Sequence, residues 1–189
     1  MTQPSSSVVL KFDPERNRLG DGKELREGLS VAARVGRNLF VASDETATVE
    51  RLTTEDERVF THHATFALAD FIDLPGGDAE EVDLEGLSYH DGYLWLVGSH
   101  SVKRKKPKDD SGDDAKNIER LARVEREGNR YTLARIPLVE TEGGDYELFK
   151  ARQNYSGAAG PLTAAQLPGT ARGNALTDAL REDEHLAPF

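Results

Sequence analysis

Hydrophobic residues of this chain occur in short runs that alternate with turn residues, a pattern typical of β-strands. The clearest example is the apolar run at 93–97, which follows the dipeptide Asp91-Gly92 and a shorter run at 87–89. Asp-Gly is a strong signal for the turn of a β-hairpin. The run at 93–97 is apolar on both faces, as expected of a strand that is covered by two layers. The pattern therefore predicts a hairpin over these residues.

The chain also repeats itself. Three matches occur in the same order: Glu-Gly-Leu-Ser at 27–30 and 85–88, the apolar runs at 39–43 and 95–99, and the segments at 49–52 and 118–121. Internal repeats of this kind are typical of architectures that stack similar units. The spacing lengthens only at the third match, which indicates one insertion between Ser99 and Ile118. Each repeat is predicted to form four short strands.

Residues 118–126 admit two interpretations. Their apolar positions fit an amphipathic helix that Asp114 would cap and Gly128 would stop. The repeat favours a strand instead, which a turn at 127–129 would join to a second strand at 130–138. We predict the strands and keep the helix as the alternative.

These strands predict an all-β fold of the β-propeller type, in which four-stranded antiparallel blades repeat around an axis. The spacing leaves room for about three blades, fewer than the four to eight that close a ring. The propeller is therefore incomplete in this chain, and a plain β-sandwich or meander is the alternative. We expect a single partial propeller domain over 1–189, with a first repeat at 8–75, a second repeat at 80–149 that carries an inserted loop at 101–116, and an irregular, helical tail at 150–189. In this tail, Asn174 is expected to cap a short helix.

Composition narrows the classes of function. The chain has no Cys, which excludes disulfide scaffolds, thiolate zinc sites and a Cys nucleophile. It has 34 acidic and 24 basic residues, and the net charge of −10 argues against nucleic acid as a partner. No apolar run is long enough to span a membrane and the N-terminus has no secretory signal, so we expect a cytoplasmic protein. The sequence also lacks a phosphate-binding loop, a nucleophile elbow and a His-Glu-x-x-His motif.

Several segments together resemble a known family. They are Glu-Gly-Leu-Ser at 27–30, Ala-Ser-Asp-Glu-Thr at 42–46, Leu-Glu-Gly-Leu at 84–87, Leu-Trp-Leu-Val-Gly-Ser-His-Ser at 94–101 followed by Lys-Arg-Lys at 103–105, and Arg-Ile-Pro-Leu at 135–138. In combination they are similar to the bacterial family known as domain of unknown function 3616, from about residue 8 to the end. The resemblance implies a propeller-like fold, more distantly similar to phytase-like propellers. It also implies that family members continue beyond the position of Phe189 with a further blade, so self-association or pairing with missing blades is expected.

Strand order places several polar residues on one rim of the predicted blades. Glu27 and Glu85 begin first strands, whereas Asp44, Glu45 and His100 follow second strands. Because the first strand runs away from the rim and the second strand returns to it, these positions share one side of the disc. Converging carboxylates suit Ca²⁺ or Mg²⁺, so the four acidic residues are candidate metal ligands. The alternatives are that each Glu accepts backbone N–H bonds at a strand entry and that Asp44 and Glu45 form a solvated turn.

The insertion after Ser99 begins with cations. Lys103 and Arg104 open a basic run that ends at Lys108, and both are candidates for binding an anion or another ligand beside the rim. The acidic run at 109–114 neutralises much of this charge, so a self-neutralising loop is the alternative. Among the His residues, His100 has the location best suited to acid–base catalysis or to contact with a phosphate.

Two functions fit these residues. The first is a scaffold that binds a small molecule or a protein partner at the blade rim, and we favour it because a half ring rarely assembles a complete active site. The alternative is a divalent-metal-assisted hydrolase of phosphate or ester substrates. In that alternative the four carboxylates hold the ion, while His100, Lys103 and Arg104 meet the anion.

Overall fold

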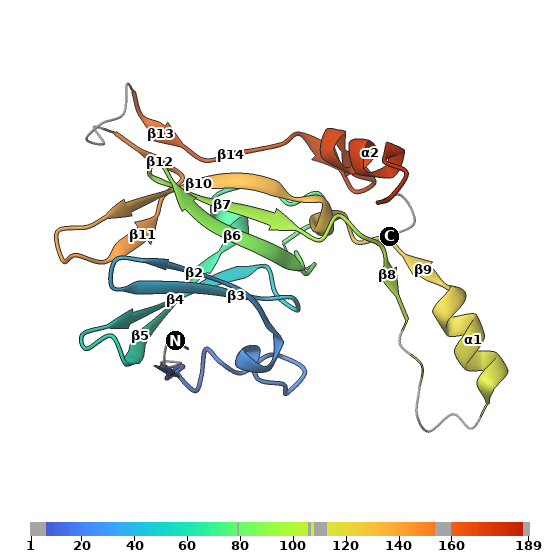
Figure 1. The fold of residues 1–189 in the computed structure, drawn as a ribbon, viewed down its shortest axis with the longest axis horizontal. Helices are drawn as coiled ribbons and strands as arrows, with labels where there is room; N and C mark the ends of the chain where they lie inside the picture. The colour runs from blue at the N-terminus through green and yellow to red at the C-terminus, as the bar shows by residue number, and fades with distance from the viewer. Residues whose placement is uncertain (1–6, 79, 106, 108–112, 154–159, 187–189) are drawn as a thin grey trace, which may run out of the picture.

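Strands dominate the structure, which is a computed structural model that describes residues 7–78, 80–105, 107, 113–153 and 160–186 (Figure 1). The strands are β1 (Val9–Leu10), β2 (Leu29–Val35), β3 (Asn38–Ser43), β4 (Thr48–Thr54), β5 (Val59–Ala67), β6 (Leu84–His90), β7 (Tyr93–Gly98), β8 (Lys103–Arg104), β9 (Val124–Glu125), β10 (Leu133–Glu140), β11 (Tyr146–Leu148), β12 (Ala151–Arg152), β13 (Leu162–Thr163), β14 (Ala165–Gln166), β15 (Gly169–Thr170) and β16 (Gly173–Asn174). The α-helices are α1 (Asp114–Ala122) and α2 (Ala175–Glu182), and short 3₁₀ turns occur at η1 (Leu25–Gly28), η2 (Leu68–Asp70) and η4 (Gly128–Tyr131). The mostly β character predicted from the sequence is therefore confirmed.

The first sheet has the strand order β1-β5-β4-β3-β2. Strands β2 to β5 form an antiparallel meander, and β1 pairs with β5 in parallel. A two-residue turn at Gly36-Arg37 joins β2 to β3, and Gly36 has a φ of +57°. Glycine adopts this left-handed conformation without a steric penalty, which makes the tight turn favourable.

The second sheet has the strand order β11-β10-β7-β6, and β14 also pairs with β10. The turn between β6 and β7 consists of Asp91 and Gly92, with φ values of +49° and +79°. Two consecutive residues with positive φ are what a type I′ hairpin turn requires. The hairpin predicted from Asp-Gly is therefore confirmed.

The strand predicted over 118–126 is wrong, because most of this segment lies in α1. The side chain of Asp113 accepts a hydrogen bond from the backbone N–H of Lys116 at 3.2 Å and thereby caps the helix. The helix lies on an arm, formed with β8 and β9, that extends away from both sheets (Figure 1). Since neither main sheet pairs with this segment, local capping and helical periodicity decide its conformation.

The third repeat match also fails to relate equivalent strands. In the first sheet, β4 is the strand that pairs with β3, whereas in the second sheet β10 pairs with β7. Residues 118–121, which match 49–52 in sequence, are helical. The turn predicted at 127–129 is instead the entry to η4, which leads into β10.

The two Glu-Gly-Leu-Ser segments occupy different positions in their hairpins. Leu29 pairs with Ser43 and lies six residues before the last residue of β2, whereas Leu87 pairs with Leu96 and lies only three residues before the end of β6. The residue of β6 that corresponds to Leu29 is Leu84, which pairs with Gly98. Consequently Glu27 precedes its strand, within η1, whereas Glu85 lies inside β6.

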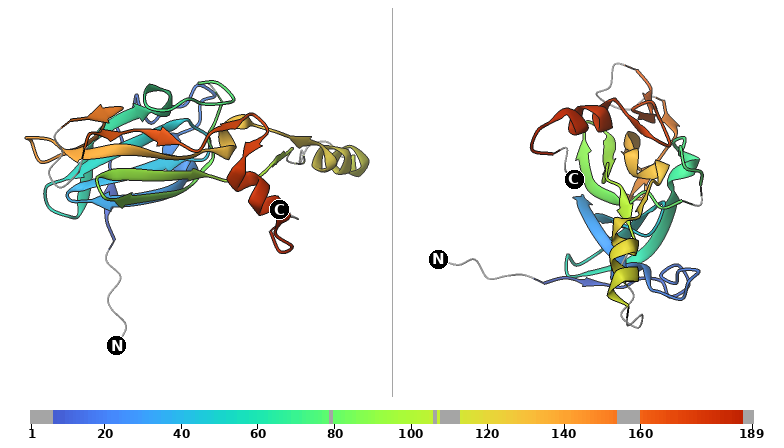
Figure 2. Two further views of the ribbon diagram at one scale, coloured as in Figure 1. Left: turned by 90° about the horizontal axis from the view of Figure 1, so that it is seen from above. Right: turned by 90° about the vertical axis from the view of Figure 1, so that its right-hand side faces the viewer.

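The main core lies between the two sheets, which pack face to face (Figure 2). The first sheet contributes Phe40, Ala42 and Val49, and the second sheet contributes Leu94, Leu96 and Ile136. All six side chains are almost completely buried. Burial of one such large apolar side chain is worth roughly 1.5–3 kcal/mol, so this interface holds the two sheets together.

A second, smaller cluster covers the opposite face of the first sheet. Val41, Leu52 and Phe60 are buried there, and Leu10 and Phe12 of the N-terminal segment pack against them. The N-terminal segment is held by β1, which extends the sheet beside β5. Both faces of the first sheet are thus covered by apolar residues.

The C-terminal tail contains the helix expected there. Asn174 accepts hydrogen bonds from the backbone N–H groups of Leu176 and Thr177, and Thr177 completes a capping box. The predicted cap is therefore confirmed. Within the described residues, neither helix is long and apolar enough to cross a membrane.

Candidate functional site

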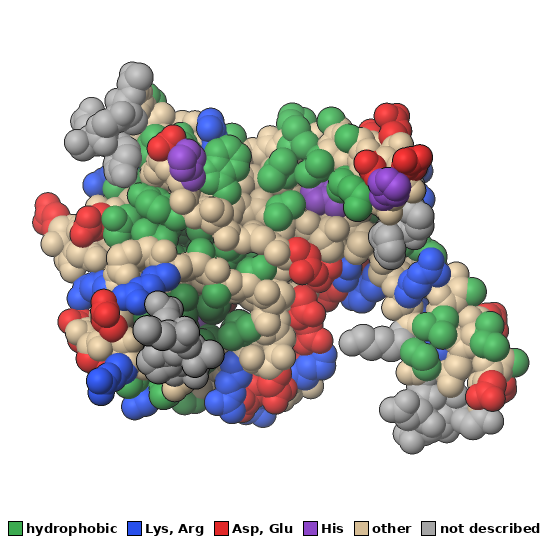
Figure 3. Space-filling model, in the orientation of Figure 1, with side chains coloured by type: hydrophobic (Ala, Val, Ile, Leu, Met, Phe, Trp, Pro, Cys, Tyr) green, Lys and Arg blue, Asp and Glu red, His purple; other side chains and the backbone are tan. Residues whose placement is uncertain are grey.

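A polar hollow opens where the arm meets the two sheets. Its volume is about 530 Å³, and it is lined by Asp44, Glu45, Glu81, Asp83, Val102, Lys103, Arg104, Lys105, Arg120, Glu125 and Arg130. Figure 3 shows acidic and basic side chains gathered in this region of the surface. Both signs of charge therefore line one recess, which we call the charged hollow.

Arg130 of η4 lies at the centre of the charges in this hollow. Only 9% of the residue is exposed, and its guanidinium group forms ion pairs with Asp83, with Glu127 at 2.8 Å and with Glu81 at 3.2 Å. Burial by itself would lower the pKa of Arg130, but the hydrogen bond to Glu127 and the neighbouring charge of Asp83 outweigh it and raise that pKa. The group is therefore a permanent cation that three carboxylates hold in place.

Lys103 of β8 extends the same network. Its Nζ atom donates hydrogen bonds to Glu81 at 2.6 Å and to Glu127 at 2.8 Å. Burial by itself would lower the pKa of Lys103, but these two hydrogen bonds outweigh it and raise the pKa above its ordinary value. For the acid Glu127 burial has the opposite effect and by itself would raise the pKa. The hydrogen bonds from Lys103 and Arg130 outweigh burial and keep the pKa of Glu127 below its ordinary value. Lys103, Glu127 and Arg130 are therefore charged at neutral pH.

Close backbone packing positions the network. The side chain of Asn129, which is fully buried, donates to the carbonyl oxygens of Gly77 and Glu80, both at 2.8 Å, and ties η4 to the loop before β6. A Cβ atom on Gly98 would lie 2.4 Å from the carbonyl oxygen of Arg130. Only glycine therefore lets the end of β7 approach η4 so closely.

The sequence-predicted residues fall into two groups. Asp44, Glu45, Lys103 and Arg104 line the charged hollow, whereas Glu27, Glu85 and His100 are not among its lining residues. Glu27 and Glu85 are exposed at the starts of their hairpins.

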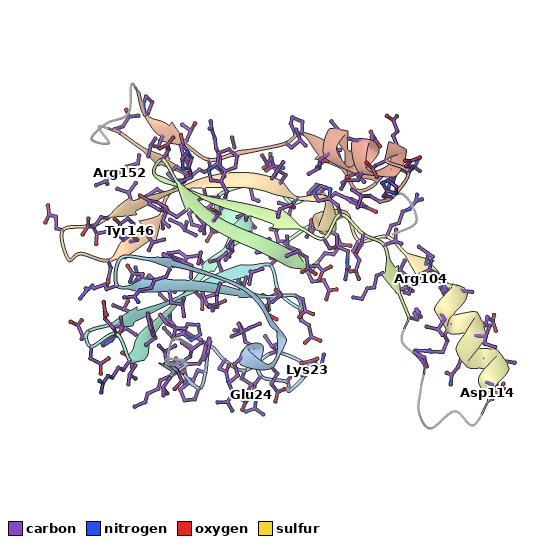
Figure 4. All side chains as sticks on the ribbon, in the orientation of Figure 1. Lys23, Glu24, Arg104, Asp114, Tyr146 and Arg152 are labelled. Carbon is purple, nitrogen blue, oxygen red and sulfur yellow. The ribbon has the colours of Figure 1, made fainter. Side chains whose placement is uncertain are left out.

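The predicted residues that line the hollow are not all free to bind. Glu45 pairs with Lys23, and Arg104 donates to the carbonyl oxygen of Leu121 at 3.2 Å. Asp44 is exposed, and its backbone N–H donates to the carbonyl oxygen of Gly28. Figure 4 shows Lys23 beside the first sheet and Arg104 at the base of the arm.

His100 lies against α2. Its Nδ1 atom is 3.0 Å from the hydroxyl oxygen of Thr177, and its ring lies 6.2 Å from that of Tyr131. Burial lowers the pKa of His100, and the nearby backbone of Thr132 opposes this effect only in part. The Nε2 atom is buried, and the described residues offer it no hydrogen-bond partner. The imidazole is therefore held mainly in its neutral form.

Among the described residues, no group of three or more His, Cys, Asp or Glu side chains is arranged to hold a metal ion. The ligand roles assigned to Glu27, Asp44, Glu45 and Glu85 thus stay predictions, as does the catalytic role of His100. Part of the basic run, at Lys106 and Lys108, lies outside the described residues.

The residues that organise the hollow were not predicted from the sequence. Asp83, Glu81 and Arg130 come from segments that no motif marked. The acidic run at 80–83 was the one signal in the sequence that pointed to this network. Carboxylates directly before a buried strand become partly buried when the chain folds, and buried carboxylates require cationic partners. Nothing in the sequence identified Arg130 as that partner.

Fold and site together define a mostly β protein that carries a charged recess beside two packed sheets. The chain belongs to the family described as "Protein of unknown function (DUF3616)", which matches residues 28–189. The family resemblance seen in the sequence is thereby confirmed. No curated protein and no solved structure gave a match to the chain.

Proposed function

We propose that this chain is a binding scaffold that recognises a protein partner through the charged hollow and the arm beside it. The scaffold is a propeller-type stack in which residues 8–75 and 80–149 supply successive blades. Two features support this arrangement: both sheets contain an antiparallel meander whose first hairpin has a two-residue turn, and the sheets pack face to face. The cytoplasm stays the expected location.

The observation that carries the proposal is the state of the charges in the hollow. Arg130 and Lys103 are already neutralised by internal carboxylates, so a simple anion would have to compete with Glu81 and Glu127. A polypeptide segment that brings both signs of charge can instead extend the existing network. We therefore favour a mixed-charge protein segment over a phosphate or a metal complex.

The arm supplies the second contact. α1 and β9 project from the sheets and expose Ile118, Leu121 and Val124, which are 67%, 43% and 43% exposed. Apolar side chains beside a polar recess are typical of protein interfaces, where an apolar centre has a polar rim. The hydrolase alternative lacks its candidate catalytic residue at the hollow, since His100 contacts Thr177 of α2 and is not among the residues that line it.

The test is affinity capture with the full chain as bait, followed by quantitative mass spectrometry. Arg104→Glu reverses an exposed charge in the hollow and should reduce recovery of the partner at least about tenfold, which corresponds to about 1.4 kcal/mol. Arg58→Glu makes the same change at an exposed position at the start of β5 and is the matched control. Equal recovery by both variants, with unchanged melting temperatures, would overturn the proposal.

A further inference from the structure

The arm carries a short strand with an open edge. β8 pairs with β9, and the two strands form a separate two-stranded sheet (Figure 1). β9 is the only described strand that pairs with β8, so the main-chain N–H and C=O groups on the other edge of β8 have no strand partner among the described residues. Such an edge is a ready template for a further strand. We call it the open edge of β8.

The open edge borders the charged hollow. Four consecutive residues, 102–105, line the hollow. Consecutive side chains of a strand point to opposite faces, so a hollow on one face would be lined by every second residue. A hollow that meets all four residues instead lies along the edge of the strand.

Side-chain contacts agree with this placement. Lys103 donates to Glu81 in the loop before β6, whereas Arg104 donates to the carbonyl oxygen of Leu121 in α1. The two neighbouring side chains thus lie on opposite faces of the β8–β9 pair, which we call the Lys103 face and the Arg104 face. Each face has a neighbour in the fold, and the edge between them opens into the hollow.

The cations of the two faces differ in their pairing. On the Lys103 face, Lys103 and Lys105 both form ion pairs with carboxylates of this chain. On the other face, the guanidinium of Arg104 is exposed, and no carboxylate pairs with it among the described residues. Arg104 is therefore the cation of β8 that is available to an incoming acidic side chain.

The opposite wall of the hollow is acidic. It consists of Asp44, Glu45, Glu81 and Asp83, which lie in the loops after β3 and before β6. Figure 3 shows acidic side chains on the sheets where these face the arm. No described cation pairs with the carboxylate of Asp44. Because Glu81 contacts Lys103, this wall lies on the Lys103 face of β8.

We infer that an extended segment of a protein partner adds to the open edge of β8 as a third strand. This inference rests on the proposed function and specifies how the partner binds in the hollow. Main-chain hydrogen bonds to β8 hold the segment, and its alternating side chains give specificity. An acidic side chain of the segment lies beside Arg104, and the residues before and after it are basic and point towards the acidic wall. The hollow of about 530 Å³ has the size of a small-ligand site, which suits a few extended residues and not a folded domain.

A second copy of this chain does not meet these requirements. Residues 103–105 are three consecutive cations, so β8 paired with another β8 would place cation opposite cation. Like charges directly opposite each other destabilise a strand pair. The same charges disfavour any basic strand and select a segment in which acidic and basic residues alternate.

The first test is a calorimetric titration of the purified full chain with the peptide acetyl-Lys-Glu-Lys-Val-Lys-amide. In an extended conformation, its Glu and Val side chains share one face and its Lys side chains share the other. The dissociation constant should be below about 1 mM, and Arg104→Glu should raise it at least about tenfold. Arg58→Glu, at an exposed position outside the hollow, should bind the peptide like the wild type. The peptide acetyl-Lys-Lys-Glu-Val-Lys-amide has the same net charge without the alternation and should bind at least about tenfold more weakly.

The second test addresses the main-chain bonds directly. Alternate N–H groups of an added strand point towards β8, and the others point away from it. Methylation of the Glu and Val nitrogens and methylation of the three Lys nitrogens should therefore differ at least about tenfold in their effect on the dissociation constant. Circular dichroism of both methylated peptides checks that they stay equally extended.

Two results would overturn strand addition: failure of the alternating peptide to bind at about 1 mM, or equal binding of the two methylated peptides. If either result occurs while Arg104→Glu still reduces capture of the natural partner, strand addition is wrong and the proposed binding function stands. If Arg104→Glu leaves capture unchanged, the proposed function itself is wrong. The two failures are thus distinguishable.

Discussion

Arg130 and Asp83 form a buried ion pair although 47 positions separate them in the sequence. The guanidinium Nη1 atom of Arg130 donates to the carboxylate of Asp83, which lies directly before β6. The pair thereby joins η4 to the first strand of the second sheet, and the charged hollow is built around it. Charges in such a position stabilise a fold only while both partners are present.

Replacement of Arg130 by Met should therefore be strongly destabilising. The change leaves Asp83, Glu81 and Glu127 close together without their common cation, and removal of one partner of a buried pair costs about 3–5 kcal/mol. The melting temperature should fall by at least about 6 °C for a domain of this size. Thermal melts of Arg123→Met provide the control, because this side chain is 69% exposed and forms only a 3.8 Å ion pair. A double variant with Asp83→Asn should recover part of the loss, and equal melting temperatures for the two single variants would contradict the prediction.

His100 should make the fold sensitive to mild acid. Burial lowers its pKa in the folded state below the ordinary value of 6.5, so the unfolded chain binds the proton more readily. The free energy of unfolding should accordingly be unaffected by this group above pH 6.5 and should decrease as the pH falls below it. Chemical denaturation at several pH values measures this dependence. The free energy of unfolding should change less steeply with pH below 6.5 in His100→Asn than in the wild type. Asn is chosen because it tolerates the φ of +52° found at this position. The exposed His90, replaced in the same way, should leave the slope unchanged, and an unaltered slope in His100→Asn would refute the assignment.

Gly98 should resist replacement even by Ala. The added Cβ atom would lie 2.4 Å from the carbonyl oxygen of Arg130, and backbone atoms cannot move away as a flexible side chain can. Overpacking of this kind costs about 1–3 kcal/mol. Gly20→Ala is the matched control, because nothing lies within 4 Å of its added Cβ atom. Denaturation midpoints that agree between the two variants would show that β7 and η4 are less closely packed than described.

The two helix caps should differ in their contribution to stability. Asn174 caps α2 and also donates a buried hydrogen bond to the carbonyl oxygen of Tyr131, so Asn174→Ala should cost about 2 kcal/mol. Asp113 caps α1 on the projecting arm, so Asp113→Ala should reduce helix content by circular dichroism and leave the main transition almost unchanged. A larger loss of global stability for Asp113→Ala would mean that the arm is part of the cooperative core.

Chelation should leave the melting temperature of the purified chain unchanged. Glu27 and Glu85 lie outside the charged hollow, and Glu45 is engaged by Lys23. A ligand that binds only the folded state raises its stability by mass action, so thermal melts with EDTA and with restored calcium give a direct answer. A melting temperature that falls with EDTA and recovers with calcium would establish the rim carboxylates as ligands and would favour the hydrolase alternative.

The hairpin at 84–98 and the C-terminal helix were predictable because their signals are local. Asp91-Gly92 specifies a tight turn whatever surrounds it, and Asn174 with Thr177 closes a capping box within four residues. The prediction for the arm was wrong because it relied on a long-range sequence repeat and not on a local signal. The sequence repeat implied a strand at 118–126, but neither main sheet pairs with that segment, so helical periodicity prevailed over most of it.

The sequence by itself thus determined the mostly β character, the family, the tight turn of the second hairpin and the capped tail helix, all of which depend on neighbouring residues. Tertiary structure alone decided the rest: that Arg130 meets Asp83 and Glu81, and that His100 faces α2. Charge pairing and sheet packing act between segments far apart in the chain. Their partners are selected only when the fold excludes water and brings these segments together.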